Sequence, residues 1–172
     1  NRKLKERDIY LNKLIAFQDT EPVKVITGIR RCGKSSLLKL MQEHLLHSGV
    51  KQEQIIAINF ESLEFLEINT AALLAKHLIE TTKHLDGKLY YFFDEIQLVQ
   101  DWEKVVNGLR VDRDCDIYIT GSNSSLISGE LATLLAGRYV EFEIQPFTFD
   151  EFIEVFQEKR LSKEDLFNKF IQ

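Results

Sequence analysis

The sequence has few of the residues that cross-link a chain, interrupt it or anchor it in a membrane. It contains 2 cysteines, 2 prolines and 1 methionine among 172 residues. Because Cys32 and Cys115 form neither a disulfide framework nor a paired zinc-binding motif, we expect a reducing compartment, most simply the cytoplasm. No apolar run approaches the ~20 residues of a membrane helix. The charged N-terminus is not followed by an apolar stretch, so we expect no signal peptide and no membrane partner.

The sequence also lacks an excess of positive charge. Lys and Arg number 22 against 27 Asp and Glu, which gives a formal net charge of −5. This balance disfavours a broad nucleic-acid-binding surface but not a local basic patch, so nucleic acid stays open as a partner. The 44% hydrophobic and 28% charged residues are ordinary for a globular protein, and the length suits one domain. Because the chain begins without Met and stops within a helical pattern, we expect a piece of a longer protein.

Short apolar runs recur along the chain at intervals that suit strands. They predict strands at residues 23–27, 55–59, 89–93, 116–120 and 138–144. The middle runs are apolar at successive positions, which indicates burial on both faces of a parallel sheet. The last run differs, because Glu141 and Glu143 alternate with Val140 and Phe142. That alternation predicts an edge strand with one face toward water.

Helical patterns separate these runs. They predict helices over 34–46, 69–85, 101–113 and, as a short Leu-rich segment, about 128–136. The alternation of strand and helix predicts an α/β fold with three layers, in which a parallel sheet lies between two layers of helices. After Pro146 the pattern is helical only. We therefore expect a core over 1–146 and the beginning of a helical subdomain over 147–172.

A glycine-rich loop follows the first predicted strand. Residues 28–35 fit the P-loop pattern, with two glycines five positions apart followed by Lys and Ser. The glycines let backbone N–H groups turn toward phosphate oxygens, Lys34 reaches the β- and γ-phosphates, and the Ser35 hydroxyl binds Mg²⁺. The helix dipole from Lys34 onward adds to the attraction. The predicted nucleotide-binding residues are Gly28, Ile29, Arg30, Arg31, Cys32, Gly33, Lys34, Ser35 and Ser36.

The pattern leaves the residues between the two glycines free, and three of these have chemistry to consider. Arg30 and Arg31 either add positive charge beside the triphosphate or are solvated. Cys32 is interpreted as a tolerated residue at a free position, with an oxidation-sensitive loop as the alternative.

An acidic pair ends the third predicted strand. Asp94 and Glu95 follow a run of apolar and aromatic residues, which is the Walker B form. We expect Asp94 to hold Mg²⁺ opposite Ser35 and Glu95 to polarise the attacking water. Together with Lys34 as a catalytic cation, this pair favours a hydrolase-type ATPase over a small-molecule kinase. The chain also lacks the Asn-Lys-x-Asp motif with which a GTPase recognises guanine.

Small polar residues follow the fourth predicted strand. One of Thr120, Ser122 and Asn123 is expected to hydrogen-bond the γ-phosphate or the attacking water, and the sequence does not decide which. Asn59, at the tip of the second strand, either restrains Glu95 by a hydrogen bond or is a plain strand-end residue.

An arginine precedes the edge strand. Arg138 either projects toward the γ-phosphate of a neighbouring subunit, which would imply a homo-oligomer, or forms a local salt bridge. The sequence leaves both interpretations open.

With these motifs in place, the chain resembles the predicted AAA+-type ATPases of bacteria and archaea known as AAA domain group 14, which are close to the archaeal and STAND ATPases. The similarity runs from about residue 9 to 152 and includes phrases at 27–35, 59–61, 93–97, 120–122, 137–139 and 145–152. The resemblance implies a P-loop ATPase whose five strands lie in the order 5-1-4-3-2. It also implies a C-terminal helical lid and a further domain.

Two functions fit these residues. The first is an ATPase that uses Mg²⁺ and couples hydrolysis to a conformational change in a larger protein, with an unidentified protein partner. The second is a switch that holds ATP or ADP and turns over slowly. Glu95 favours the first function, because a pure switch does not need a base. We expect slow turnover of this chain alone, since no arginine is placed in its own site with certainty.

Overall fold

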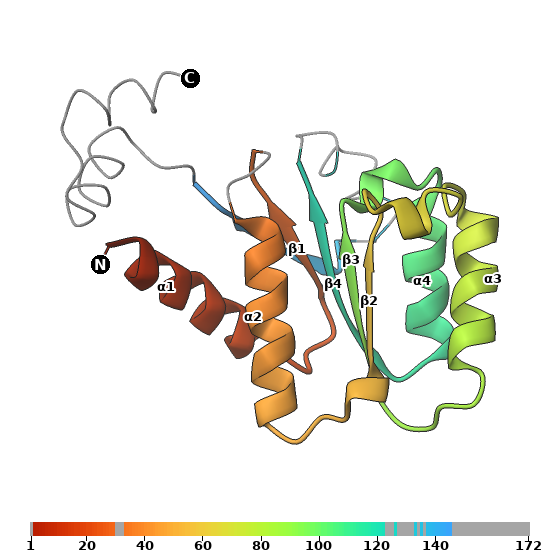
Figure 1. The fold of residues 1–172 in the computed structure, drawn as a ribbon, viewed down its shortest axis with the longest axis horizontal. Coiled ribbons are helices and arrows are strands. Elements are labelled where there is room, and N and C mark those ends of the chain that lie inside the picture. Colours follow the sequence, from red (N-terminus) through yellow and green to blue (C-terminus); the bar gives the residue numbers. More distant parts are fainter. Residues whose placement is uncertain are drawn as a thin grey trace.

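One parallel sheet organises the structure. The computed structural model describes residues 2–29, 33–122, 126, 133, 135 and 137–145. Its strands are β1 (Val23–Thr27), β2 (Ile55–Asn59), β3 (Leu89–Asp94), β4 (Cys115–Gly121) and β5 (Tyr139–Glu143). They lie in the order β2-β3-β4-β1-β5, and every neighbouring pair is parallel (Figure 1). This confirms the predicted fold class and the order that the resemblance implied.

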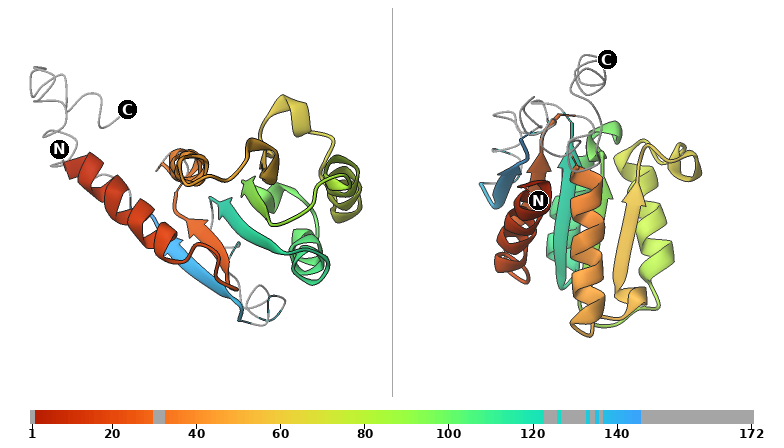
Figure 2. Two further views of the ribbon diagram at one scale, coloured as in Figure 1. Left: turned by 90° about the horizontal axis from the view of Figure 1, so that it is seen from below. Right: turned by 60° about the vertical axis from the view of Figure 1, so that its left-hand side comes forward.

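In the described part of the chain, two helices cover each face of this sheet (Figure 2). One face carries α1 (Arg2–Ala16) and α2 (Lys34–His47), and the other carries α3 (Ala71–Thr82) and α4 (Trp102–Asp112). Three short 3₁₀ turns complete the described elements: Gln52–Gln54, Leu63–Phe65 and Ile96–Leu98. None of the helices described is long and apolar enough to cross a membrane. The arrangement is the expected three-layer sandwich.

The aromatic residues of β3 show why both faces are apolar. Successive side chains of a strand point to opposite faces. Tyr91 and Phe93 pack in the core beneath α3 and α4, whereas Tyr90 and Phe92 pack in the core beneath α1 and α2. Phe92 stacks on Tyr118 of β4 with ring centroids 4.7 Å apart. A run that is apolar at every position is therefore needed at this central strand.

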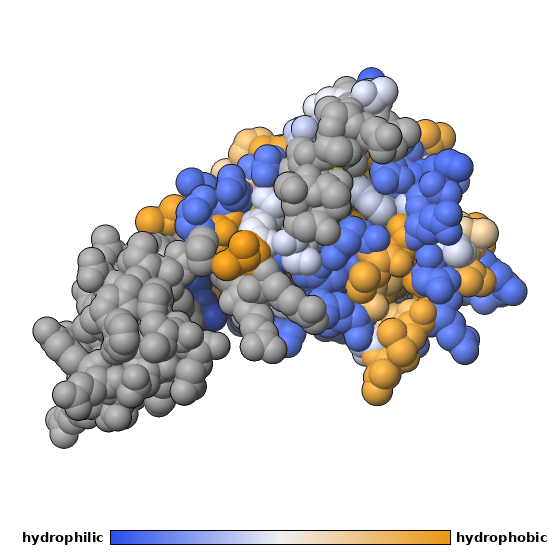
Figure 3. Space-filling model, turned by 90° about the horizontal axis from the view of Figure 1, so that it is seen from above, coloured by the Kyte–Doolittle hydropathy of each residue, from blue (hydrophilic) through white to orange (hydrophobic). Residues whose placement is uncertain are grey.

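The predicted edge strand is confirmed at β5. Glu141 and Glu143 are exposed, while Phe142 between them is buried and meets Phe17 edge-on at 5.6 Å between ring centroids. Figure 3 looks onto the end of the sheet where the strands finish, and apolar residues reach the surface there among hydrophilic ones. Leu63 and Leu98, on the turns after β2 and β3, are 85% and 49% exposed.

The N-terminal helix α1 is the element that sequence reasoning missed. Its charged residues obscure the apolar face that packs on the sheet and on α2, where Leu14 is fully buried. The hydroxyl of Tyr10 on the same helix accepts a hydrogen bond of 3.3 Å from the backbone N–H of Gln145, just after β5. The helix therefore contributes to the core between α2 and the sheet.

Two of the predicted helices need correction, one at its bounds and one at its cap. The segment expected over 69–85 is helical only from Ala71, because Thr70 caps it by accepting a hydrogen bond from the N–H of Leu73. Asp101 precedes α4 as predicted, but its side chain makes no capping bond and its backbone is left-handed, with φ of 59°. The helices expected over 128–136 and within 147–172 lie outside the described residues, apart from single positions of the first.

A buried ion pair fixes the amino ends of β1 and β4. The Lys24 ammonium donates to the Asp116 carboxylate at 2.5 Å and to the carbonyl of Thr20 at 2.7 Å, and both charged side chains are fully buried. Asp116 also accepts from the hydroxyl of Tyr118 and from the N–H of Asp19. Burial lowers the pKa of Lys24, against the opposing pull of Asp116, and raises the pKa of Tyr118, so the phenol remains a donor. The Asp116 carboxylate is thus held by three donors: one from β1, one from the turn before β1 and one from its own strand, β4.

Lys24→Met should destabilise the fold strongly, because it leaves the Asp116 carboxylate buried without its cation. Breaking one side of such a pair costs about 3–5 kcal/mol of unfolding free energy. Urea unfolding measures the loss, and Lys39→Met on the exposed side of α2 is the matched control, expected within about 0.5 kcal/mol of the parent. Equal losses in the two variants would contradict a structural role for the pair.

Candidate active site

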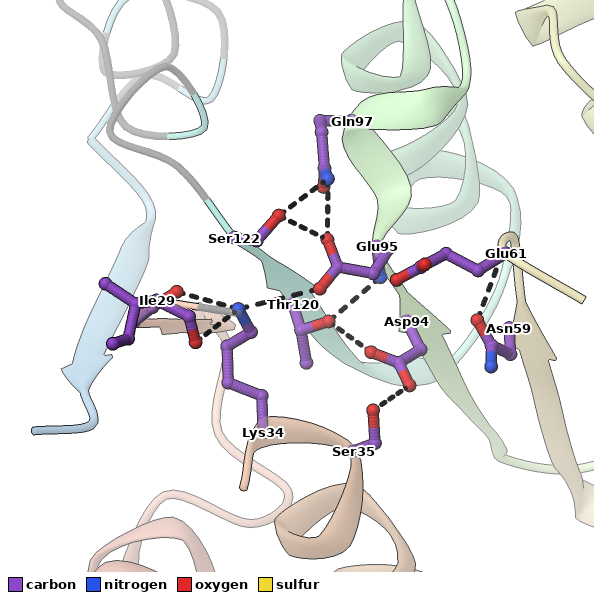
Figure 4. Close-up of polar contacts among 11 residues, drawn as sticks. Ile29, Lys34, Ser35, Asn59, Glu61, Asp94, Glu95, Gln97, Thr120 and Ser122 are labelled. Atoms are coloured by element: carbon purple, nitrogen blue, oxygen red, sulfur yellow. Dashed lines mark hydrogen bonds and ion pairs between the residues drawn. The ribbon is translucent and has the colours of Figure 1, made fainter. Parts of the chain in front are cut away.

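Most of the residues predicted to be catalytic meet at the carboxyl end of the sheet: Lys34, Asp94, Glu95, Thr120 and Ser122 (Figure 4). Thr27 at the end of β1 is level with Gly121 at the end of β4, and Asn59 of β2 is level with Asp94 of β3. In open α/β sheets ligands bind outside the carboxyl ends of the strands. The register therefore gathers the phosphate loop, the acidic pair and the residues after β4 at one place.

Lys34 opens α2 and turns back into the loop. Its ammonium donates to the carbonyl oxygens of Gly28 at 2.7 Å and Ile29 at 3.4 Å, and it lies 3.5 Å from Oε1 of Glu95. Gly33 precedes it with φ of 103°, a left-handed conformation that glycine adopts without strain. Because Lys34 is buried, these oxygen atoms stabilise its positive charge in place of water.

The remaining residues predicted to bind nucleotide lie on either side of this turn. Ser35 and Ser36 occupy the first turn of α2, and the Ile29 side chain is exposed. Arg30, Arg31 and Cys32 lie outside the described residues.

Asp94 ends β3 between two hydroxyl groups. Its Oδ2 accepts from the Ser35 hydroxyl at 2.6 Å, and its Oδ1 accepts from the Thr120 hydroxyl at 2.5 Å. The two side chains expected to bind Mg²⁺, Ser35 and Asp94, are thus in direct contact. Both present the hard oxygen atoms that this ion prefers, so the residues present fit it.

Glu95 follows with a strained backbone. Its φ of 58° and ψ of 49° are left-handed, which costs a non-glycine residue about 1–2 kcal/mol. Such conformations persist where the surrounding structure fixes them, often at functional sites. Here they turn the Glu95 carboxylate toward Lys34 of the phosphate loop. Its Oε2 accepts from Nε2 of Gln97 at 2.6 Å and from the hydroxyl of Ser122 at 2.9 Å.

The three residues expected to sense the γ-phosphate separate in the structure. The Thr120 hydroxyl is fully buried and bonds to both residues of the acidic pair. It donates to Asp94 and accepts from the backbone N–H of Glu95 at 2.9 Å. Ser122 instead contacts the Glu95 carboxylate. Asn123 lies outside the described residues.

The proposed restraint of Glu95 by Asn59 is not present. The side-chain oxygen of Asn59 accepts from the backbone N–H of Glu61 at 3.0 Å, which is the bond of a plain strand-end residue. Gln97 occupies the role instead, and sequence reasoning missed it. The only available signal was its position two residues after Glu95, within a phrase that the resemblance had marked.

Arg138 lies at the opposite end of the sheet. Its carbonyl accepts from the N–H of Val23, the first residue of β1, so one strand length of about 16 Å separates it from the phosphate loop. Its Nη1 lies 3.5 Å from Oε1 of Glu21, and its side chain is 64% exposed. The local ion pair therefore exists, and Arg138 does not join the site of its own chain.

Comparison with known proteins shows which family the chain belongs to. The model of a family described as an AAA domain matches residues 20–153. The chain belongs to this AAA domain family. As an AAA domain it is a nucleotide-binding ATPase module. The matched range contains each of the residues placed above, from the phosphate loop to Arg138.

Two curated relatives are longer proteins. An uncharacterized protein of Haemophilus influenzae is 48% identical over 147 residues, which are 86% of this chain and 37% of that protein. An uncharacterized protein of Methanocaldococcus jannaschii is 37% identical over 153 residues, 88% of this chain and 32% of that protein. The AAA domain thus spans about a third of the length of the curated relatives it matches.

Solved structures share the fold at low sequence identity. The Cdc6p protein of Pyrobaculum aerophilum matches with a TM-score of 0.56 and 12% identity, over 92% of this chain and 48% of that one. The ORC1 protein of Aeropyrum pernix, solved in complex with DNA, matches with a TM-score of 0.61 and 13% identity, over 89% and 49%. At this identity the likeness extends to the arrangement of the sheet and helices.

Thr120→Val should destabilise the AAA domain although it keeps the side chain's shape. It removes the donor to Asp94 and the acceptor for the Glu95 N–H, and each buried polar group left unpaired costs about 1–3 kcal/mol. Denaturant unfolding should therefore show a loss of about 2–6 kcal/mol.

Thr27→Val is the matched control. The Thr27 hydroxyl donates at 2.8 Å to Glu141, an exposed carboxylate that water can solvate in its place. We expect its loss to stay near 1 kcal/mol, the net value of an ordinary hydrogen bond. Similar losses for both threonines would mean that the Thr120 contacts do not stabilise the acidic pair.

Proposed function

We propose that this AAA domain binds ATP with Mg²⁺ at the carboxyl end of the sheet, hydrolyses it, and thereby drives a conformational change in a longer protein. The observation that carries the proposal is one set of contacts. Ser35 touches Asp94, and Lys34 lies 3.5 Å from Glu95, so the groups for metal, phosphate and water adjoin one another.

We assign Lys34 to the β- and γ-phosphates. Its present bonds to two loop carbonyls are neutral acceptors, and phosphate oxygens bind an ammonium more strongly because they are charged. Positive φ at Gly28 and Gly33, 148° and 103°, supports a loop whose N–H groups turn toward the phosphates. The remaining loop residues assigned to nucleotide are Ile29, Arg30, Arg31, Cys32, Ser35 and Ser36.

We assign Ser35 and Asp94 to the metal ion. When bound, Mg²⁺ would offset the charge that develops on the phosphate oxygens. Ser35 offers its hydroxyl directly, and Asp94 acts through water. Thr120 keeps the Asp94 carboxylate in place by the hydrogen bond to its other oxygen.

We assign Glu95 to the attacking water. Its Oε1 is the oxygen nearest Lys34 and hence nearest the phosphate side. A carboxylate there accepts the proton of water as the bond to phosphorus forms. Ser122 and Asn123 remain the candidates for contact with the γ-phosphate or the water.

A slow nucleotide switch is the second candidate. It is favoured by the contact between Glu95 and Lys34, because the base is engaged before nucleotide arrives. It is also favoured by the distance of Arg138, since an arginine at the transition state adds about 10³–10⁵-fold to the rate. Under this proposal ATP and ADP would set the conformation and hydrolysis would reset it.

The proposal also includes a helical lid, a protein partner, a cellular compartment and a homo-oligomer. We expect residues 147–172 to begin a helical lid, a protein partner to receive the conformational change, and a reducing compartment such as the cytoplasm to hold the protein. Nucleic acid stays open as a partner. Arg138, exposed at the far end of the sheet, is free to reach a neighbouring copy's nucleotide in a homo-oligomer, once its weak pair with Glu21 opens.

Three variants test the assignment on the same ATP binding and hydrolysis assays. Lys34→Ala should lose about 10- to 150-fold in affinity for ATP, because a charge-assisted contact worth ~1.5–3 kcal/mol is removed. Glu95→Gln should bind ATP as the parent does and hydrolyse it ~10²–10⁴-fold more slowly. Asp94→Asn should weaken Mg²⁺-dependent binding and hydrolysis together.

The outcomes separate the two candidates. Hydrolysis that stops in Glu95→Gln supports the ATPase. Tight binding with negligible turnover in the parent supports the switch. Unchanged affinity in Lys34→Ala would overturn the nucleotide site itself.

Arg138→Ala should test the contribution of a second copy. If Arg138 acts in a neighbour's site, the parent's specific activity should rise with protein concentration, and the variant should lose that rise while keeping its ATP affinity. Arg110→Ala is the matched control, because Arg110 pairs with the same Glu21 at 3.5 Å but is far less exposed. Activity independent of concentration in the parent would exclude the contribution.

A further inference from the structure

The two oxygens of the Glu95 carboxylate have different surroundings. Oε2 accepts from Nε2 of Gln97 at 2.6 Å and from the hydroxyl of Ser122 at 2.9 Å, and these two donors are 3.3 Å apart. Figure 4 shows the three side chains closing a triangle above β4. Oε1 faces Lys34 instead, at 3.5 Å. One oxygen is therefore held by neutral donors, while the other shares the Lys34 ammonium with two carbonyls of the phosphate loop.

Gln97 reaches this place from a firmly anchored turn. It lies in the turn Ile96–Leu98, whose first residue, Ile96, is fully buried in the core beneath α3 and α4. Ser122 comes from a different element, the end of β4. Two separate segments thus converge on one oxygen of a side chain with three rotatable bonds.

Gly121 leaves the room that Gln97 needs. A Cβ built at position 121 would lie 3.0 Å from Oε1 of Gln97 and only 2.4 Å from the side chain of Leu126. Oε1 is buried against this backbone and has no hydrogen-bond partner among the described residues, while the N–H₂ group faces the Glu95 carboxylate and donates to it. The opposite orientation would place an oxygen against the carboxylate, which donates nothing.

We propose that Gln97 is a positioning residue for the base: with Ser122 it holds Oε2 of Glu95, so that Oε1 meets the attacking water once Lys34 turns to the phosphates. The inference rests on the proposed function, and it assigns Gln97 no contact with the reacting atoms. Its energetic basis is orientation, since a base displaced by about 1 Å can cost ~10²-fold in rate. By holding Oε2, Gln97 restricts the rotation of the Glu95 side chain before nucleotide binds.

The test is Gln97→Met, which keeps the length of the side chain and removes its donors. We expect kcat to fall about 10- to 100-fold, while KM and the affinity for ATP stay within about twofold of the parent. Gln100→Met is the matched control, because Gln100 is exposed three residues further along and its substitution should leave kcat unchanged. Unchanged or raised kcat in Gln97→Met would overturn the proposal.

A double-mutant cycle separates positioning from a structural role. In a Glu95→Gln background, Gln97→Met should cause no further loss of kcat, because there is no base left to position. An equal loss in both backgrounds would show that Gln97 acts on the fold and not through Glu95. Urea unfolding of the single variant checks that the protein remains folded.

Crystal structures of the protein and of Gln97→Met, each with and without a non-hydrolysable ATP analogue, give a readout independent of turnover. The parent should keep Oε2 of Glu95 on Gln97 in both states, and the variant should show Glu95 in another rotamer. An unmoved Glu95 in the variant would overturn the positioning role. If the parent binds ATP without hydrolysing it, the ATPase proposal fails, and the Glu95 rotamer still decides the role of Gln97.

Discussion

Three charged side chains are buried at one end of an otherwise apolar sheet, and the arrangement around them depends on their mutual compensation. Lys34, Asp94 and Glu95 are each at most 7% exposed. A buried charge without a partner costs several kcal/mol, so each must find one nearby. Lys34 and Glu95 face each other, and Asp94 takes two hydroxyl donors. The phosphate loop, the end of β3 and the end of β4 are held together by this requirement.

The same compensation explains why the site suits a charged ligand. The three groups leave one net negative charge, carried by Asp94, whose partners among the described residues are the hydroxyls of Ser35 and Thr120. A triphosphate alone would be repelled by it, whereas a triphosphate with a divalent cation would not. Under the proposed function, these buried charges favour a nucleotide that carries a divalent cation.

The sequence predicts strands and helices well where the hydrophobic pattern is strong. It predicts them poorly where an element is stabilised by contacts with distant segments of the chain. The bounds of β1 and β2 are as predicted, because each is a short apolar run with clear ends. The helix α1 was missed, because its apolar face is interrupted by charges. The order of the strands came from the family resemblance. A strand that is apolar on both faces is predicted to be buried, but its sequence does not identify the strands that pair with it.

Several residues predicted for the site lie together, among them Lys34, Asp94 and Glu95, but most of the contacts that support them were not predictable. Thr120 bonds Asp94 because β3 and β4 pair with Phe93 opposite Ile119, and that register is a property of the sheet. Gln97 reaches Glu95 because of a left-handed backbone at residue 95 that sequence patterns do not signal. Motifs thus identify the chemistry, and the register decides which side chains support it.

The buried pair of Lys24 and Asp116 restricts how this domain can move. A shift of β1 by one residue would carry Lys24 to the opposite face of the sheet, into the apolar core beneath α3 and α4. The pair therefore fixes the register of β1 against β4, and with it the relative positions of Thr27 and Gly121 at the ends that precede the phosphate loop and Ser122. If nucleotide drives a conformational change as proposed, we expect the loops at the carboxyl end of the sheet to move while the register of β1 and β4 stays fixed.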